Sequence, residues 1–130
     1  MIKKYDVVII GAGAAGMMCA IEAGKRGRKV VLLDHAKKIG EKIRISGGGR
    51  CNFTNINTDY KKFISSNPNF MISALNQYTH QNFIDLIQKY QISFHEKKLG
   101  QLFCDQSAQQ IIDMLKMECE KANVLLLNNT

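Results

Sequence analysis

The first informative pattern along the chain is a short apolar run that ends in closely spaced glycines. Residues 7–10 read VVII, and residues 11–16 follow as GAGAAG. Apolar residues then recur at i, i+3, i+4 and i+7, as Ala14, Met17, Met18 and Ile21. This spacing is typical of one face of a helix. A second apolar run follows at residues 29–33. The pattern predicts a buried strand, a helix and a second buried strand, which form one βαβ unit over residues 4–34.

The glycines between the first strand and the helix are spaced as G-x-G-x-x-G, at Gly11, Gly13 and Gly16. In this motif the first glycine permits a tight turn, the second lets the backbone approach a pyrophosphate, and the third lets the helix pack closely. Asp34 ends the second strand, 18 residues after Gly16. A carboxylate at this place accepts hydrogen bonds from ribose hydroxyls. The alternative is an ordinary βαβ unit without a ligand.

The segment over residues 35–57 is long, glycine-rich and basic, and it shows no evident helix. A loop of this length is usually functional or disordered. Three consecutive glycines, at 47–49, suit a backbone that lies flat against a ligand. Polar side chains that could donate or accept hydrogen bonds follow, as Arg50, Asn52, Thr54 and Asn55. The segment is therefore a candidate binding loop, with a flexible surface loop as the alternative.

The second half of the chain alternates between helical and strand patterns. We expect a helix that starts at Asn67 and Pro68, a second helix with Phe83, Leu86, Ile87 and Tyr90 on one face, and short strands at 92–94 and 101–104. We further expect a third helix from Ser107 with a capping box to Gln110, and a strand at 124–127. The third helix has a stripe of apolar residues, namely Ala108, Ile111, Ile112, Leu115, Cys119 and Ala122. This order is consistent with an α/β fold around a parallel sheet with right-handed crossovers.

The composition is that of a globular protein and supports no metal site. The chain has 130 residues, of which 45% are hydrophobic and 22% charged, so it forms one domain or part of one. No apolar run reaches the roughly 18 residues that span a bilayer, and the N-terminus does not resemble a signal peptide. The four cysteines lack C-x-x-C spacing and the three histidines are scattered, so we expect mostly core thiols in a reducing, cytoplasmic compartment.

The positive charge of the chain is concentrated in its first half. Residues 1–62 contain 13 Lys and Arg against 5 Asp and Glu, whereas residues 63–130 contain 5 against 6. Excess positive charge near a pyrophosphate loop suits a dinucleotide. It could also attract nucleic acid, but no RNA- or DNA-binding motif accompanies it, so no nucleic-acid partner is expected. A solvated basic face is the other interpretation.

Together with the glycine loop and Asp34, the run SGGGRCNFTN at residues 46–55 carries a resemblance to a known family. The sequence resembles the N-terminal part of bacterial NAD(P)/FAD-dependent oxidoreductases described as aminoacetone-oxidase-like or 3-dehydro-bile-acid reductase-like. The strongest match is GEKIRISGGGRCNFTN at residues 40–55, and LGQLFCDQSAQQIIDML at residues 99–115 adds to it. The resemblance covers essentially all 130 residues.

The resemblance implies an α/β, Rossmann-like FAD-binding domain with a parallel sheet, present here as an N-terminal fragment of a two-domain flavoprotein. The expected organisation of this domain, residues 1–130, is the βαβ unit 4–34, a cofactor loop 35–57, a helical insertion 58–98 and a further helix and strand over 107–128. The substrate domain of the family is expected to be absent.

The resemblance also implies which residues hold the cofactor. FAD would lie extended, with its pyrophosphate at Gly11, Gly13, Ala14, Ala15 and Gly16 and its adenosine ribose at Asp34. The residues that match the loop along the cofactor are Lys42, Ser46, Gly47, Gly48, Arg50, Cys51, Asn52 and Thr54. Three positions depart from the family pattern. Asp34-His35 stands where Glu-Lys is more usual, Arg44 replaces an apolar residue and Cys104 replaces a proline.

These observations predict the FAD-binding portion of a flavin-dependent oxidoreductase that acts on an unknown small molecule, with NAD(P)H as a candidate electron donor. Residues 1–130 alone are expected to be inactive, and no membrane partner is expected. The catalytic residues and the oligomeric state stay open. Cys51 is interpreted as a packing residue rather than a redox residue. Two alternatives remain: a non-catalytic NAD or FAD module or truncated product, and a relative of tRNA-modifying flavoproteins, suggested by the basic first half.

Overall fold

The computed structural model describes residues 2–130. A parallel sheet forms one end of the molecule, with strands in the order β1 (Val7–Ile10), β2 (Val30–Leu33) and β6 (Leu125–Leu127). β1 pairs with β2 from Val7 beside Val30 to Ile10 beside Leu33. The βαβ unit predicted from the sequence is therefore present, and β6 extends its sheet at the side of β2.

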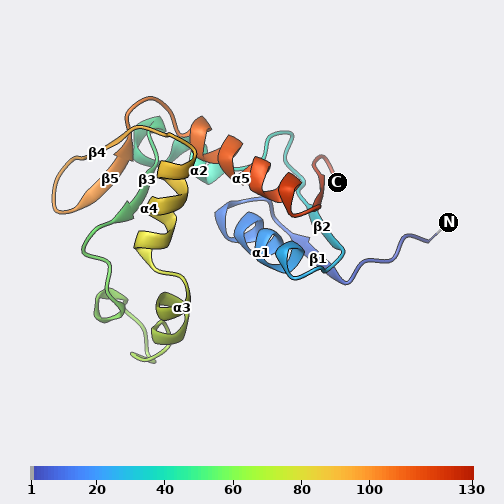
Figure 1. The fold of residues 1–130 in the computed structure, drawn as a ribbon, viewed down its shortest axis with the longest axis horizontal. Helices are drawn as coiled ribbons and strands as arrows, with labels where there is room; N and C mark the ends of the chain where they lie inside the picture. Colours follow the sequence, from blue (N-terminus) through green and yellow to red (C-terminus); the bar gives the residue numbers. More distant parts are fainter. Residues whose placement is uncertain (1) are drawn as a thin grey trace.

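Two long helices, α1 (Ala14–Lys25) and α5 (Gln109–Lys121), lie side by side against this sheet (Figure 1). The predicted apolar stripe of α5 is confirmed, because all six of its residues are buried. Gly24 allows the close approach of the two helices, since a Cβ at this position would lie 2.4 Å from the Ala122 carbonyl oxygen. The main core lies where these helices meet the buried strand β2.

A second sheet, which is antiparallel, lies at the end of the molecule away from the chain termini (Figure 1). Its strands are in the order β3 (Asn52–Asn55), β5 (Gln101–Cys104) and β4 (Phe94–Glu96). The helix α4 (His80–Lys89) packs on β3, where the ring of Phe53 lies 6.1 Å from that of Phe83. The shorter elements are α2 (Glu41–Ile45), α3 (Ile72–Gln77) and the 3-10 turns η1 (Ser46–Gly49) and η2 (Tyr60–Lys62).

The expectation that β1 is a buried strand is wrong. Val8 and Ile10 are 58% and 86% exposed. β1 is the edge strand of the sheet, and alternate residues of a strand point to opposite faces. Only one face of β1 is covered, so half of its apolar side chains are exposed to solvent. Ala14 is likewise exposed, although it was assigned to the buried face of the first helix.

The expectation that residues 35–57 contain no helix is also wrong, because α2, η1 and β3 lie within this segment. α2 has five residues, too few to display helical periodicity. Two predicted helix starts shift as well. The helix expected from Asn67 begins at Ile72, and Ser107 Oγ accepts from the Gln109 amide instead of forming a capping box with Gln110. Cys19 is exposed, whereas the other cysteines are buried.

Across residues 2–130, no helix combines the length and the apolar character needed to cross a membrane. The same residues contain no group of three or more His, Cys, Asp and Glu side chains arranged to hold a metal ion.

Candidate functional site

The glycine turn between β1 and α1 is shaped by close backbone contacts. Gly11 has a φ of +104°, and its amide donates to the Leu33 carbonyl oxygen at 2.7 Å. A Cβ on Gly16 would lie 1.8 Å from the Gly11 carbonyl oxygen. Real side chains never approach a backbone oxygen this closely, so Gly16 is required for α1 to start directly against the turn. This is the packing role that the glycine spacing predicts.

The N-terminus of α1 is open and carries no negative charge. Gly13 is the N-cap residue, no side chain caps the helix, and the first turn contains no acidic residue. A Cβ built on Gly11 or Gly13 would have no atom within 4 Å. The first backbone N–H groups of a helix lack partners within the helix, and the helix dipole makes this end positive. The space above the turn therefore suits an anion such as a pyrophosphate.

Asp34 lies beside the glycine turn and is held by backbone donors. Its Oδ1 accepts from the Ala36 amide at 2.8 Å and its Oδ2 accepts from the Ala12 amide at 2.6 Å. The hydrogen bond from Ala36, and to a smaller extent that from Ala12, lowers the pKa of Asp34 below its ordinary value. The side chain is 13% exposed and negatively charged at neutral pH. Each carboxylate oxygen keeps a free lone pair, which fits the hydroxyl pair of a ribose.

These elements line one cavity of about 640 Å³. Of the predicted site residues it contains Gly11, Gly13, Ala14, Ala15, Gly16, Asp34 and Lys42. We call it the glycine cavity.

Gly40 also lines the glycine cavity, although it is not among the predicted site residues. Its amide donates to the Ala12 carbonyl oxygen at 3.0 Å, and its φ is +70°. Gly40 thereby joins the start of α2 to the glycine turn. A single glycine directly before a short polar helix is the only signal in the sequence that could have indicated this contact.

A second cavity of about 260 Å³ shares Ala14, Lys42 and Ile43 with the glycine cavity. It brings together three further predicted residues, Ser46, Cys51 and Asn52, and its walls include apolar side chains of α4 and α5. Burial raises the pKa of the Cys51 thiol above its ordinary value, so the thiol stays protonated at neutral pH.

The other predicted residues, Gly47, Gly48, Arg50 and Thr54, line neither of these two cavities. Gly47, Gly48 and Arg50 belong to the turn that leads into β3, and Thr54 lies in β3 itself. Gly47 and Gly48 have φ values of +56° and +64°, and a Cβ on Gly47 would lie 2.8 Å from the ring of Phe103. Arg50 Nη1 donates to the Asp105 carbonyl oxygen, and Thr54 pairs with Leu102 in the second sheet.

Cys104, which stands where the resembled family has a proline, also contacts this turn. Its amide donates to the Arg50 carbonyl oxygen at 3.0 Å, a bond that a proline could not make. Burial, with a smaller contribution from Cys51, raises the pKa of the Cys104 thiol to about 11. Both thiols are therefore protonated at neutral pH, and a buried thiol of this kind is unreactive.

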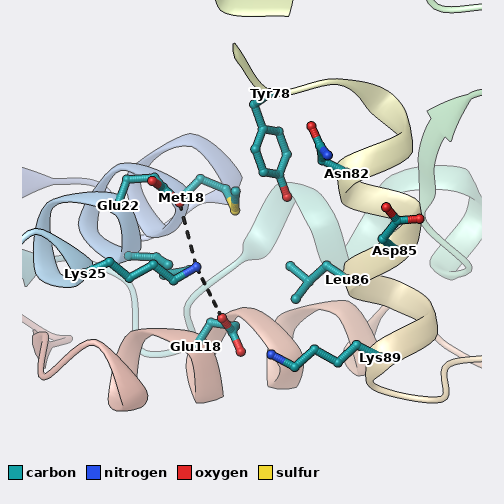
Figure 2. Close-up of a pocket in the computed structure, with 10 residues that line it drawn as sticks. Met18, Glu22, Lys25, Tyr78, Asn82, Asp85, Leu86, Lys89 and Glu118 are labelled. Atoms are coloured by element: carbon teal, nitrogen blue, oxygen red, sulfur yellow. Dashed lines mark ion pairs between the residues drawn. The ribbon is translucent and has the colours of Figure 1, made fainter. Parts of the chain in front are cut away.

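A third cavity, of about 260 Å³, lies between α1, α4 and α5 and is lined by charged side chains (Figure 2). Lys25 Nζ lies 3.8 Å from Glu22 Oε1 and 3.7 Å from Glu118 Oε2. The side chain of Tyr78 points into this space (Figure 2). We call it the charged pocket.

The carboxylate of Glu118 is the buried member of the charged pocket, 4% exposed. It accepts a hydrogen bond from the Tyr90 hydroxyl at 2.5 Å and one from Lys121 Nζ at 3.4 Å. Burial alone would raise the pKa of Glu118, but these two hydrogen bonds and the nearby lysines bring it below its ordinary value.

Solved structures share the fold of this chain at low sequence identity. A 3-ketosteroid-delta4-(5alpha)-dehydrogenase from Rhodococcus jostii RHA1 superposes with a TM-score of 0.63 at 15% identity, over 96% of this chain and 38% of that one. THI4 of Thermovibrio ammonificans gives 0.59 at 16% identity, over 95% and 38%. The predicted fold class is confirmed: the chain has the α/β fold of a Rossmann-like FAD-binding domain with a parallel sheet.

The chain belongs to the HI0933-like family, because residues 5–130 match the HI0933-like protein Rossmann domain. It is 58% identical over 94% of its length to the ribosomal RNA dihydrouridine synthase of Escherichia coli K12, and 52% identical over 98% to the Haemophilus influenzae protein of the same name. A 3-dehydro-bile acid delta(4,6)-reductase of Clostridium scindens is 30% identical over 89%. The chain spans only about 30% of the length of these relatives.

Proposed function

We propose that this chain is the FAD-binding portion of a flavin-dependent oxidoreductase that reduces uridine in ribosomal RNA to dihydrouridine. The proposed substrate is supported by the 58% identity, over nearly the whole chain, to a protein named ribosomal RNA dihydrouridine synthase. Because the chain spans about 30% of that relative, the activity is a proposal for the complete gene product. It replaces the expectation of a small-molecule substrate and of no nucleic-acid partner.

In this proposal the glycine cavity holds the adenosine half of FAD. The open N-terminus of α1 binds the pyrophosphate, and the bare backbone at Gly13 lets it approach closely. The ionised carboxylate of Asp34 accepts hydrogen bonds from the ribose, while Ala12 and Ala36 fix its orientation. The size of the cavity, about 640 Å³, is within the range of cofactor sites.

The adjoining second cavity would lie along the flavin half of the cofactor. Lys42 belongs to both cavities, and Ser46 and Asn52 add polar groups to the second one. When bound, FAD supplies hydride chemistry. The residues of this chain bind and orient it and keep apolar walls around it. We assign no proton donor among them.

The names of the relatives agree on the type of reaction. A dihydrouridine synthase saturates the double bond of a uracil ring, and a delta(4,6)-reductase likewise reduces carbon–carbon double bonds. Both need a source of electrons, for which NAD(P)H is the candidate. The higher identity to the RNA-modifying relatives favours uridine as the substrate over a steroid-like molecule.

The test uses protein expressed from the complete reading frame. We expect it to purify with FAD and, given NADPH and ribosomal RNA transcribed without modifications, to convert uridine to dihydrouridine, as measured by mass spectrometry of the digested RNA. The matched control is Asp34→Ala, which should contain less FAD and form less product. A flavin-loaded protein that oxidises NADPH with another acceptor but leaves the RNA unchanged would contradict the substrate. A colourless protein that binds NAD would contradict the cofactor.

A further inference from the structure

The segment after Asp34 separates the glycine cavity from a groove on its other side. Asp34, His35 and Ala36 line the glycine cavity, whereas the next residues, Lys37 and Lys38, line a groove of about 330 Å³. Side chains from α2 and α5 and from the end of β6 complete the groove. The candidate cofactor site and this groove are therefore lined by consecutive residues of the same segment.

The groove is strongly basic. Its lining includes four cationic side chains, Lys37, Lys38, Arg44 and Lys116, and a single carboxylate, Asp113. Among residues 2–130, no ion pair involves any of the three lysines. Positive charge that is concentrated in a concave surface raises the local concentration of anions.

The walls of the groove are fixed by hydrogen bonds. Asn128 Nδ2 donates to the Lys37 carbonyl oxygen at 2.7 Å, and the Asn129 amide donates to the Ala36 carbonyl oxygen at 3.2 Å. Arg44 joins two walls, because Nη2 donates to the Ile39 carbonyl oxygen at 2.9 Å and Nη1 donates to Gln109 Oε1.

The charged pocket shows that the basic groove is not simply an average part of a basic protein. In the pocket, the cations Lys25 and Lys89 are accompanied by three carboxylates, Glu22, Asp85 and Glu118 (Figure 2). The groove has the opposite balance. The positive charge of the groove would repel a cation, whereas a chain of phosphates could contact several of its cationic side chains at once.

We infer that the basic groove binds the phosphodiester backbone of the RNA substrate. This inference rests on the proposed function. Lysine and arginine contacts to phosphates fix the position of an RNA without reading its sequence. Because residues 34–36 line the glycine cavity and residues 37 and 38 line the groove, RNA bound in the groove passes next to the candidate cofactor site. A specific uridine would then be selected by other parts of the complete protein.

The test measures binding of in-vitro-transcribed ribosomal RNA to the protein from the complete reading frame, by filter binding over a range of salt concentrations. The variant Lys38→Glu/Lys116→Glu reverses two charges of the groove. The control Lys3→Glu/Lys4→Glu makes the same change in charge at two exposed residues outside the groove. We expect the first variant to bind the RNA roughly tenfold or more weakly. The slope of the logarithm of its binding constant against the logarithm of the salt concentration should fall in magnitude by about two. The control should change both values much less.

Each outcome decides one point. Equal losses in the two variants, or none in the groove variant while its FAD content is normal, overturn the assignment to the groove but leave the proposed function intact. A groove variant that binds RNA normally but has a raised KM for NADPH also overturns the assignment of the groove to RNA. It would assign the groove to a nucleotide phosphate instead. Wild-type protein that does not bind the RNA at all contradicts the proposed function itself. Arg44→Leu, which removes a single cation from the groove, should show a smaller loss of RNA affinity.

Discussion

The glycine cavity and the charged pocket lie at the two ends of α1 and are built in different ways. The glycine cavity consists largely of backbone, with four glycines in its lining, and its Asp34 carboxylate is itself held by backbone amides. The charged pocket consists of side chains from three helices, and its ion pairs span 3.7 and 3.8 Å (Figure 2). The shape of the glycine cavity depends mainly on the course of the backbone, whereas the charged pocket depends on individual side chains.

This difference predicts unequal sensitivity to mutation. A cavity built from backbone is disrupted when a substitution adds a Cβ where there is no room for one. No neighbouring side chain can then take over the role of its backbone polar groups. Exposed ion pairs contribute little because water solvates both partners well. The following changes test this contrast, from the largest expected effect to the smallest.

Gly16→Ala should have the largest effect. Its Cβ would lie 1.8 Å from the Gly11 carbonyl oxygen, so the helix or the turn must move. We expect the free energy of unfolding to fall by about 3 kcal/mol, the upper part of the range for overpacking, as measured by urea denaturation. An unchanged denaturation midpoint would show that the glycine turn adapts easily, and the contrast with the charged pocket would be lost.

Asp34→Ala should weaken the binding of FAD by roughly 1.5–3 kcal/mol, the range for the loss of hydrogen bonds to a charged group. Titration of the apoprotein with FAD measures this. Asp34→Asn is the matched control, because it keeps the shape and loses the charge. Unchanged affinity in Asp34→Ala would show that the ribose lies elsewhere.

The pH dependence of FAD binding follows from the same carboxylate. The pKa of Asp34 is lowered in the folded protein by the amides of Ala36 and Ala12, so folding favours its ionised form. Its contribution to stability is fully present above the ordinary Asp pKa of about 3.9 and is lost as the pH falls through the lowered value. We expect constant FAD affinity from neutral pH down to mildly acidic pH, in titrations at several pH values. A loss of affinity already near neutral pH would assign the effect to another group.

Gly13→Ala should separate binding from folding. Gly13 has a φ of −88°, which alanine adopts readily, and its Cβ would have no atom within 4 Å. We expect the free energy of unfolding to stay within about 0.5 kcal/mol of wild type. The affinity for FAD should fall about tenfold, or about 1.4 kcal/mol, because the new methyl group occupies the space of the pyrophosphate. Normal FAD affinity would mean that the phosphates do not lie over Gly13.

Lys25→Met should have the smallest effect. Lys25 pairs with Glu22 and Glu118, but its side chain is 53% exposed, and Glu118 keeps its hydrogen bonds from Tyr90 and Lys121. Because water reaches the Lys25 end of both pairs, we expect the free energy of unfolding to change by only about 0.2–1 kcal/mol, with FAD affinity unchanged. Denaturation and FAD titration check both values, and a loss as large as that of Gly16→Ala would reverse the comparison.

The sequence alone determined the parts of this protein that depend on local order. The spacing of Gly11, Gly13 and Gly16 predicted a turn whose packing the structure confirms, and the stripe of α5 was predicted residue by residue. The position of Asp34 after the second strand predicted a carboxylate near the turn, where the structure places it. These features lie within one helix or one βαβ unit, so their physical causes are visible at short sequence separation.

Only the tertiary structure decided what depends on distant partners. β3 was missed because its ladder forms with β5, nearly fifty residues away. Val8 and Ile10 are exposed because no element covers their face of β1, which its own residues do not reveal. The basic groove likewise brings together Lys37 and Lys116, which are far apart in the sequence. Hydrophobic periodicity shows which face of an element prefers burial, but the packing of all elements together decides which element covers it.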